Sequence, residues 1–279
     1  MSTGVSSRVG SSTVNPRRGA LAVGVMHAGE LVWQASRVRM RRAWELEAWN
    51  WARFARTPGH DHSHGDINLP ALLELLPAPG SHTLDLGCGE GRLGRILHSA
   101  GHQVVGIDAS PTMVRLAATH DVPESALVAD AAGLPFRAGA FDLVVAYMSL
   151  HDIDPMPAAA AEIARVLERG GRLCMAIVHP LSSAGSFHGR REATAPFIIT
   201  GSYLEPAPVT TVVDRGGIQV TFHSEHRPLE AYSRALEAAG MLIEAVREVG
   251  SNDELAARDP AERRWMRVPL FLHIRAVKR

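Results

Sequence analysis

Short apolar segments alternate with helix-forming segments between residues 83 and 178 of this 279-residue chain. We expect strands over 83–86, 103–107, 126–129, 141–146 and 172–178. We expect helices between them over 91–100, 111–119 and 156–167. Near-continuous apolar strands separated by helices indicate a parallel sheet that is covered on both faces. The alternation therefore predicts a doubly wound α/β fold.

The segment before this alternation is predicted to be helical. No Pro or Gly interrupts residues 37–56, and Thr57-Pro58-Gly59 then supplies a stop. A histidine-rich loop follows over 59–66, and a short helix follows the loop over 69–76. We divide the chain into a partly disordered extension over 1–36, a helical lid over 37–80 and an α/β core over 81–279.

The segment over 180–227 interrupts the core with Ser, Gly and Pro residues. Within it, two β-prone runs flank Asp214-Arg215-Gly216-Gly217, which predicts a β-hairpin on an inserted flap. A helix over 229–239 and strands over 242–249 and 268–277 are expected to follow. The last strand has apolar residues on both faces, as a strand lying between two others would.

Charge and cysteine content limit the partners and the compartment. The 29 Lys and Arg residues balance the 29 Asp and Glu residues, so the formal net charge is zero with His neutral. This balance argues against a nucleic acid or a membrane surface as partner, since both attract positive proteins. The apolar runs are far shorter than the roughly 20 residues that cross a bilayer. Cys88 and Cys174 do not resemble the disulfide framework of a small secreted protein. We therefore expect a cytoplasmic protein, and the flap could serve a homodimer.

A glycine-rich turn follows the first expected strand. The sequence LDLGCGEGR places Gly87, Gly89 and Gly91 at a tight turn into a helix. Glycines there let a ligand approach the backbone, and the helix presents free N–H groups. Asp108 ends the second strand, where a carboxylate can accept hydrogen bonds from both ribose hydroxyls. The pattern predicts a nucleotide-like ligand at this edge of the sheet.

The glycines alone fit two classes of cofactor. Gly89, Gly91 and Gly94 satisfy the G-x-G-x-x-G pattern of nicotinamide-dependent enzymes. Asp85 is placed to meet an ammonium group and Asp130 to receive an adenine amine, and both favour a different cofactor. An NAD(P)-dependent oxidoreductase and a non-catalytic cofactor-binding subunit stay as alternatives.

Four segments occur in a characteristic order, namely LDLGCGEG, GIDASPTM, VADAAGLPF and FDLVVAYMSLHDI. Together with RVLERGGRLCMAI they resemble the class I S-adenosylmethionine-dependent methyltransferases over residues 83–176. The resemblance implies a Rossmann-like sheet of seven mostly parallel strands, with an antiparallel last strand inserted between two others. It also implies S-adenosylmethionine as the cofactor.

The resemblance implies roles for individual residues as well. Asp85 and the glycines Gly87, Gly89 and Gly91 would hold the methionine part of the cofactor, and Tyr147 would lie beside it. The ribose and adenine would be bound by Asp108, Ala109, Met113, Asp130 and Ala131. The N/D-P-P-Y/F motif of methyltransferases that modify amino groups of nucleic acid bases is absent, so DNA base methylation is not expected.

More loosely, TPGHD, VAYMSLxD, VHP and HRPLEAY resemble a bacterial small-molecule subgroup described as ubiquinone-biosynthesis-like, or type 11. Many members of that subgroup have Met where His151 stands here. The subgroup therefore does not identify the substrate of this chain.

Two histidines are candidate catalytic residues, because methyl transfer needs a base when the acceptor must lose a proton. His151 follows the fourth strand and His179 ends the fifth, so both are expected at the sheet edge where the acceptor lies. A capping or loop role is the alternative for His151, and a strand-end histidine hydrogen-bonded to the backbone is the alternative for His179. An unperturbed His151 predicts a rate that rises with pH near 6.5.

Trp44 and Trp51 are candidate substrate-binding residues, because tryptophan rings can hold a flat or cationic molecule. A place in the core is the alternative for both. The histidines of the 59–66 loop fix no coordination geometry, so no metal is predicted, and we expect the loop to fold over the cofactor. The sequence as a whole predicts a methyltransferase acting on O, N or C of a small aromatic or heteroaromatic secondary metabolite.

Overall fold

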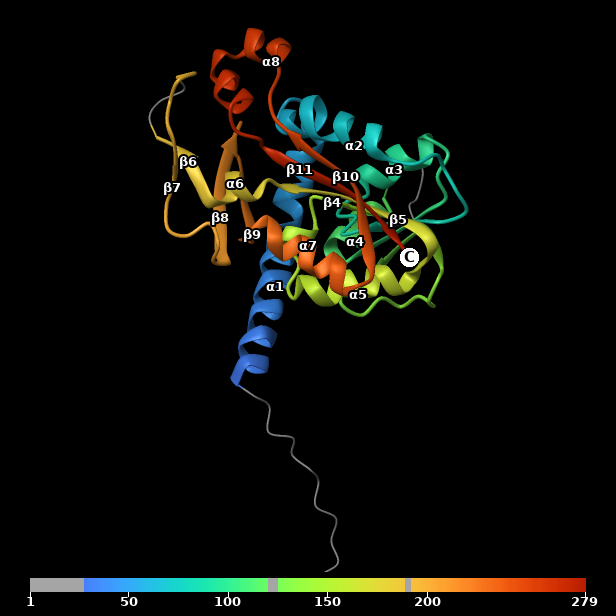
Figure 1. The fold of residues 1–279 in the computed structure, drawn as a ribbon. Coiled ribbons are helices and arrows are strands. Elements are labelled where there is room, and N and C mark those ends of the chain that lie inside the picture. The colour runs from blue at the N-terminus through green and yellow to red at the C-terminus, as the bar shows by residue number, and fades with distance from the viewer. Residues whose placement is uncertain (1–27, 120–124, 189–191) are drawn as a thin grey trace, which may run out of the picture.

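The structure is a computed structural model that describes residues 28–119, 125–188 and 192–279, with side chains from residue 40 onward (Figure 1). The disorder predicted near the N-terminus lies outside the described residues.

A seven-stranded sheet forms the centre of the fold, in the order β10-β11-β5-β4-β1-β2-β3. Its strands are β1 (Thr83–Leu86), β2 (Val104–Asp108), β3 (Ser125–Val128), β4 (Phe141–Tyr147), β5 (Leu167–Val178), β10 (Met241–Val249) and β11 (Phe271–Lys278). The strand β11 is antiparallel to both of its neighbours, β5 and β10, and the other pairs are parallel. The predicted insertion of the last strand between two others is confirmed, and so is the Rossmann-like sheet.

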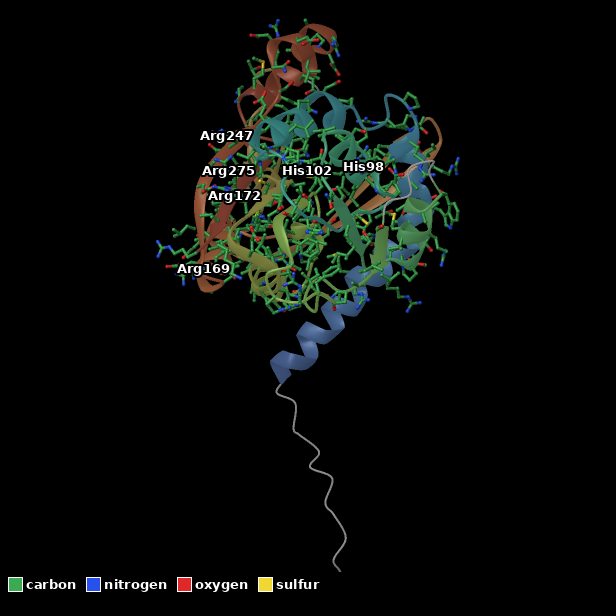
Figure 2. The ribbon with its side chains drawn as sticks, turned by 90° about the vertical axis from the view of Figure 1, so that its right-hand side faces the viewer. His98, His102, Arg169, Arg172, Arg247 and Arg275 are labelled. Atoms are coloured by element: carbon green, nitrogen blue, oxygen red, sulfur yellow. The ribbon has the colours of Figure 1, made fainter. Side chains whose placement is uncertain are left out.

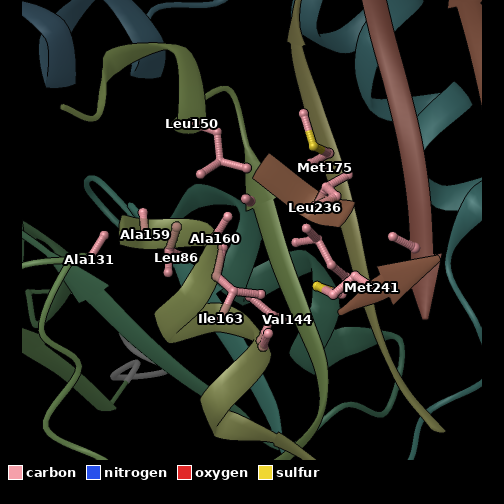
Figure 3. Packing of buried hydrophobic residues seen from close by; sticks show 14 of the residues in the cluster. Leu86, Ala131, Val144, Leu150, Ala159, Ala160, Ile163, Met175, Leu236 and Met241 are labelled. Atoms are coloured by element: carbon pink, nitrogen blue, oxygen red, sulfur yellow. The ribbon is translucent and has the colours of Figure 1, made fainter. Parts of the chain in front are cut away.

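Alternate residues of the central strands pack on opposite faces of the sheet. In β4, Val144 belongs to the cluster under α5 (Met156–Val166) and α7 (Leu229–Ala238), and its neighbour Val145 belongs to the cluster under α2 (Leu69–Leu75) and α3 (Arg92–Ser99). Figure 3 shows the first cluster, in which Ile163 of α5 lies beside Val144. Helices therefore cover both faces, as near-continuous apolar strands require.

The remaining elements of the core lie in the connections between strands. They are α4 (Pro111–Ala117), η2 (Leu150–Asp152), α6 (Pro180–Ala184), β6 (Gly185–Phe187), β7 (Phe197–Ile199), α8 (Asp253–Arg258) and η3 (Pro260–Met266). The sequence analysis did not predict α8 and η3. Side-chain caps begin both, since Asn252 accepts a hydrogen bond from the backbone N–H of Leu255 and Asp259 accepts one from Ala261.

The helical lid begins with α1 (Ala28–Arg56), which starts before the predicted residue 37 and extends away from the core in Figure 1. A short π-helix, η1 (His64–Asn68), leads directly into α2. The predicted hairpin is formed by β8 (Ala207–Arg215) and β9 (Ile218–His226). Gly216 and Gly217 make its turn with positive φ angles of 58° and 77°, and β9 packs along α1.

None of the helices within the described ranges is both long enough and apolar enough to cross a membrane.

A buried histidine connects the lid to the sheet and makes stability depend on pH. His273 of β11 is fully buried, and its Nε2 lies 2.7 Å from Oδ1 of Asn68. Burial lowers the pKa of His273 to about 4. Because this value is below the unfolded one, the contribution to stability is complete above about pH 6.5 and is lost as the pH falls toward 4.

We therefore expect the free energy of unfolding to fall by about 2 kcal/mol between pH 7.5 and pH 5 on account of His273. The variant His273→Gln keeps a donor toward Asn68 but does not titrate. In this variant, the decrease of about 2 kcal/mol in the free energy of unfolding between the two pH values should disappear. Urea denaturation of both proteins at the two pH values measures the difference. Equal pH dependence in the two proteins would show that His273 is not buried in its neutral form.

Candidate active site

A cavity of about 570 Å³ lies at the carboxyl ends of β1, β2 and β4. Its walls come from the glycine loop after β1, from α1, from the histidine loop and from the hairpin β8–β9. Small-molecule sites commonly have volumes of about 300 to 1,000 Å³. The predicted position of the site at this edge of a doubly wound sheet agrees with the general rule for such folds.

The glycine loop is held open by contacts that exclude side chains. The backbone N–H groups of Gly87 and Cys88 donate to the carbonyl oxygen of Ile107, over 2.8 and 2.9 Å. Gly87 has a φ of 77°, and a Cβ there would lie 2.5 Å from Cβ of Ser149. Gly89 has a φ of 56°, and a Cβ there would project toward Trp51, across space that the cavity occupies. The loop therefore offers a bare backbone to a ligand.

Asp108 connects the glycine loop to α4. Its Oδ2 accepts a hydrogen bond from the N–H of Gly89 over 2.9 Å, and its Oδ1 accepts one from Ser110 over 2.8 Å. Burial raises the pKa of Asp108, and these two hydrogen bonds act in the opposite direction. Asp108 lines the cavity, and a carboxylate oxygen that already accepts one hydrogen bond can accept a second from a hydroxyl.

The other residues predicted to bind the cofactor also line this cavity. Asp85 is buried at its β1 end, and Asp130 lies after β3, where its Oδ1 accepts from the N–H of Ala132 and its Oδ2 is 3.5 Å from Arg41. The remaining lining residues of this set are Gly87, Gly89, Ala109, Met113, Ala131 and Tyr147. Gly91 does not line the cavity. It precedes α3 as its N-cap residue, with a φ of 82°.

These residues fit S-adenosylmethionine. Three carboxyl groups lie near the carboxyl ends of the neighbouring strands β1, β2 and β3: Asp85 within β1, Asp108 at the end of β2 and Asp130 after β3. This is the order that an ammonium group, a ribose and an adenine amine would need. The apolar Met113 lies between the last two positions in the chain. The open glycine backbone leaves room for the ligand where any Cβ would intrude.

The histidine loop closes one side of the cavity. His64 and Asp61 line it, and Nδ1 of His64 lies 2.7 Å from the hydroxyl of Tyr147. Burial, assisted by the nearby Arg92, lowers the pKa of His64 to about 4, and burial raises the pKa of Tyr147. Both groups are therefore neutral near pH 7, and the tautomer of His64 decides which of the two donates the hydrogen bond.

Two arginines hold this loop in place. Arg92 at the start of α3 pairs with Asp61 over 2.9 Å and lies over the ring of Trp51. Arg215 at the hairpin tip donates to the backbone oxygen of His60 and lies 2.8 Å from Nδ1 of His62. No group of three His, Cys, Asp or Glu side chains that could hold a metal ion occurs among the residues described here.

An aromatic roof of three residues, Trp44, Trp51 and Phe222, lines the cavity. The ring centroid of Phe222 lies 6.3 Å from that of Trp44 and 5.6 Å from that of Trp51, with the rings edge to face. The indole N–H of Trp44 donates to the backbone oxygen of His223 over 3.0 Å. The roof therefore joins α1 to β9, and both predicted tryptophans lie in the site.

His151 lies buried in the cavity wall after β4. Its Nε2 is 3.4 Å from Oδ1 of Asp152, and its Nδ1 has no hydrogen-bond partner within the described part of the chain. Burial, with a contribution from Arg227, lowers the pKa of His151 to about 3. The imidazole is therefore neutral throughout the physiological range.

His179 does not line the cavity with His151. Its Nδ1 accepts the N–H of Leu181 as the cap of α6, and its Nε2 lies 3.0 Å from Oε1 of Glu248. Both ring nitrogens are therefore engaged in structural contacts. These contacts agree with the alternative of a strand-end histidine that is hydrogen-bonded to the backbone, and a catalytic role of His179 stays a prediction.

Comparison with known proteins identifies the family. Residues 84–175 match the family described as "Methyltransferase domain". Over 200 residues the chain is 34% identical to nocamycin O-methyltransferase from Saccharothrix syringae, an alignment that spans 67% of this chain and 68% of that protein. The chain belongs to the class I S-adenosylmethionine-dependent methyltransferases. The predicted cofactor and enzyme class are thereby confirmed, and the nicotinamide-dependent alternative is set aside.

Two further relatives of this methyltransferase show how far the likeness extends. An S-adenosylmethionine-dependent methyltransferase from Mesorhizobium loti has a similar crystal structure, with a TM-score of 0.63 and 26% identity over 75% of this chain and 96% of that one. The 18S rRNA (guanine-N(7))-methyltransferase bud23 of Schizosaccharomyces pombe is 43% identical over 81 residues, which are 28% of this chain and 30% of that protein. The second likeness covers only part of the core.

Sequence reasoning did not find several residues of the methyltransferase site. Phe222 and the other hairpin residues reach the cavity only because β9 packs along α1, and no local motif encodes that contact. Arg92 and Asp61 are separated by 31 positions in the chain, and neither stands in a pattern that indicates their pairing. The histidine loop was expected near the cofactor, and the contact of His64 with Tyr147 specifies which residue reaches inward.

We expect Asp108→Ala to weaken the binding of S-adenosylhomocysteine by about 2 kcal/mol or more, roughly 30-fold, because charge-assisted hydrogen bonds are lost. Removing this carboxylate also releases the N–H of Gly89 from the geometry that keeps the loop open. Isothermal titration calorimetry measures the effect. The variant Asp253→Ala, which removes an exposed acid from α8, should bind normally, and normal binding by Asp108→Ala would contradict the assignment.

Proposed function

We propose that this methyltransferase transfers a methyl group to O, N or C of a small metabolite with an aromatic or heteroaromatic ring. The observation that carries the proposal is the aromatic roof, which faces the same cavity as the glycine loop. Flat apolar rings stack against tryptophan and phenylalanine faces at a favourable free energy. The 34% identity with a relative named as an O-methyltransferase supports oxygen as the acceptor atom.

The residues of this chain would act mainly by positioning. When bound, S-adenosylmethionine supplies an electrophilic methyl group. Asp85, Asp108 and Asp130 would hold the cofactor along the sheet edge, and the aromatic roof would hold the acceptor ring and exclude water. Where the acceptor must lose a proton, Nδ1 of the neutral His151 would accept it.

A nucleic acid substrate is a weaker fit to the surface. Figure 2 shows four arginines, Arg169, Arg172, Arg247 and Arg275, on the side of the molecule that carries β5, β10 and β11. Arg172 and Arg275 both bind Glu244, over 2.9 and 3.0 Å, so part of this charge is already compensated. Arg172 lies in the middle of β5, away from the cavity-lining Val178 at its carboxyl end. Together with the zero net charge, this arrangement supports a small-molecule substrate. We place the enzyme in the cytoplasm, where the cofactor is made.

Incubation with isotope-labelled S-adenosylmethionine and a metabolite extract tests the proposal. We expect mass spectrometry to find a small molecule that has gained one labelled methyl group, with Asp108→Ala much less active. The same incubation with total RNA serves as the comparison. Label that enters RNA and no small molecule would overturn the proposed substrate class.

For the acceptor found in this way, we expect His151→Ala to lower turnover by roughly 100-fold if a proton must be removed, with little change in cofactor affinity. Because the pKa of His151 is about 3, its protonation would not alter the rate from about pH 6 to about pH 9. This corrects the rise near pH 6.5 that an unperturbed histidine predicts. Full turnover in His151→Met, which fills similar space without a base, would assign the residue to packing.

A further inference from the structure

Three side chains that follow β4 form a polar floor in the cavity, defined here as His151, Asp152 and Asp154. His151 and Asp154 are 6% and 7% exposed, and Asp152 is slightly more accessible. All three line the same cavity as the aromatic roof. An acceptor bound there would therefore meet aromatic faces and carboxyl groups in a single pocket.

Each residue of the polar floor has a buried atom without a hydrogen-bond partner in the part of the chain that the structure describes. These atoms are Nδ1 of His151, Oδ1 of Asp152 and Oδ1 of Asp154. Buried polar atoms without partners are rare, because each leaves a hydrogen bond to water unreplaced. Two of the three atoms belong to carboxyl groups that line the cavity, so a ligand group that donates hydrogen bonds to these carboxyl groups would suit this turn.

The other acids around the cavity already have partners of opposite charge. Asp61 pairs with Arg92, Glu90 pairs with Arg56 and Arg95, and Asp130 pairs with Arg41. Asp85 and Asp108 belong to the predicted cofactor site. The two carboxyl groups of the polar floor are thus not needed for the cofactor.

The nearest cation to the polar floor is shared among several groups. Arg227 is buried, and its Nη2 lies 2.7 Å from Oε2 of Glu225 and 3.9 Å from Oδ1 of Asp154. The same guanidinium also donates to the backbone oxygens of His151 and Ile153. One guanidinium therefore faces three carboxyl groups, those of Asp152, Asp154 and Glu225, and the floor keeps an excess of carboxyl groups.

We propose that the polar floor binds a protonated amine of the methyl acceptor, so that the substrate class is an aromatic compound with a cationic nitrogen side chain. An ammonium group donates hydrogen bonds that the carboxyl groups of the floor can accept, and its charge matches the excess of carboxyl groups. Burial raises the pKa of Asp152 well above its usual value, and a bound cation would favour the carboxylate again. The amine is a recognition group and need not be the methylated atom. This inference rests on the proposed function.

Three probes of similar shape and different charge test the inference. Phenethylamine is cationic, 2-phenylethanol is neutral and 3-phenylpropionate is anionic at pH 7. Each is titrated by calorimetry into the protein saturated with S-adenosylhomocysteine. We expect phenethylamine to bind at least about tenfold more tightly than 2-phenylethanol, and 3-phenylpropionate to bind more weakly than both.

The variant Asp154→Asn keeps the size of the side chain and removes its charge. We expect it to reduce the preference for phenethylamine over 2-phenylethanol to about threefold or less, while 2-phenylethanol binds as before. Asp152→Asn provides a second, independent variant should the first fail to fold. The control Asp253→Asn, which removes the same charge from exposed α8, should keep the full preference.

Equal binding of the three probes, tighter binding of 3-phenylpropionate, or no binding of phenethylamine would overturn the inference. A full preference retained in both floor variants would overturn it as well. Failure of the unmodified protein to bind S-adenosylhomocysteine would instead overturn the proposed function, and the first step of the titration reports this separately.

Discussion

The carboxylate of Asp108 joins the parts of the site that must not move relative to one another. It binds the N–H of Gly89 in the glycine loop and the N–H of Ser110 at the start of α4. Ser110 and Thr112 in turn bind Glu45 of α1, through their hydroxyl groups. A single chain of hydrogen bonds therefore runs from the end of β1 through β2 and α4 to the helix that carries the aromatic roof. The cofactor site and the acceptor site share this support.

The roof depends on segments that are distant in sequence. α1, the histidine loop and the hairpin β8–β9 meet through the aromatic cluster around Phe222 and through the contacts of Arg215 with the loop. Each of these segments alone would expose apolar side chains to water. Packed together, they bury Phe54 and cover the cavity, so the walls of the proposed acceptor pocket come largely from parts of the chain outside the central sheet.

The sequence predicted the sheet, its strand alternation and the inserted β11 because apolar periodicity and glycine turns are local signals. It also predicted that Asp108, Asp130 and the glycine loop would meet at one edge, because parallel strands place their carboxyl ends together. Other properties of the site have no local signal in the sequence. Nothing near His179 shows that its ring caps α6, and nothing near His151 shows that burial lowers its pKa. Those properties come from tertiary packing, as do α1's contact with β9 and the pairing of Arg92 with Asp61.

The strand β11 is made last of the seven and yet lies inside the sheet, between β10 and β5. Its residues Leu272, Ile274 and Ala276 are fully buried, and β10 joins the sheet only through it. During synthesis, β1 to β5 can pair while the ribosome is still translating, but β10 has no place until β11 emerges. The edge of β5 therefore stays unpaired in the nascent chain while the hairpin and α7 are synthesised. Protection of this edge by chaperones would matter most during that period.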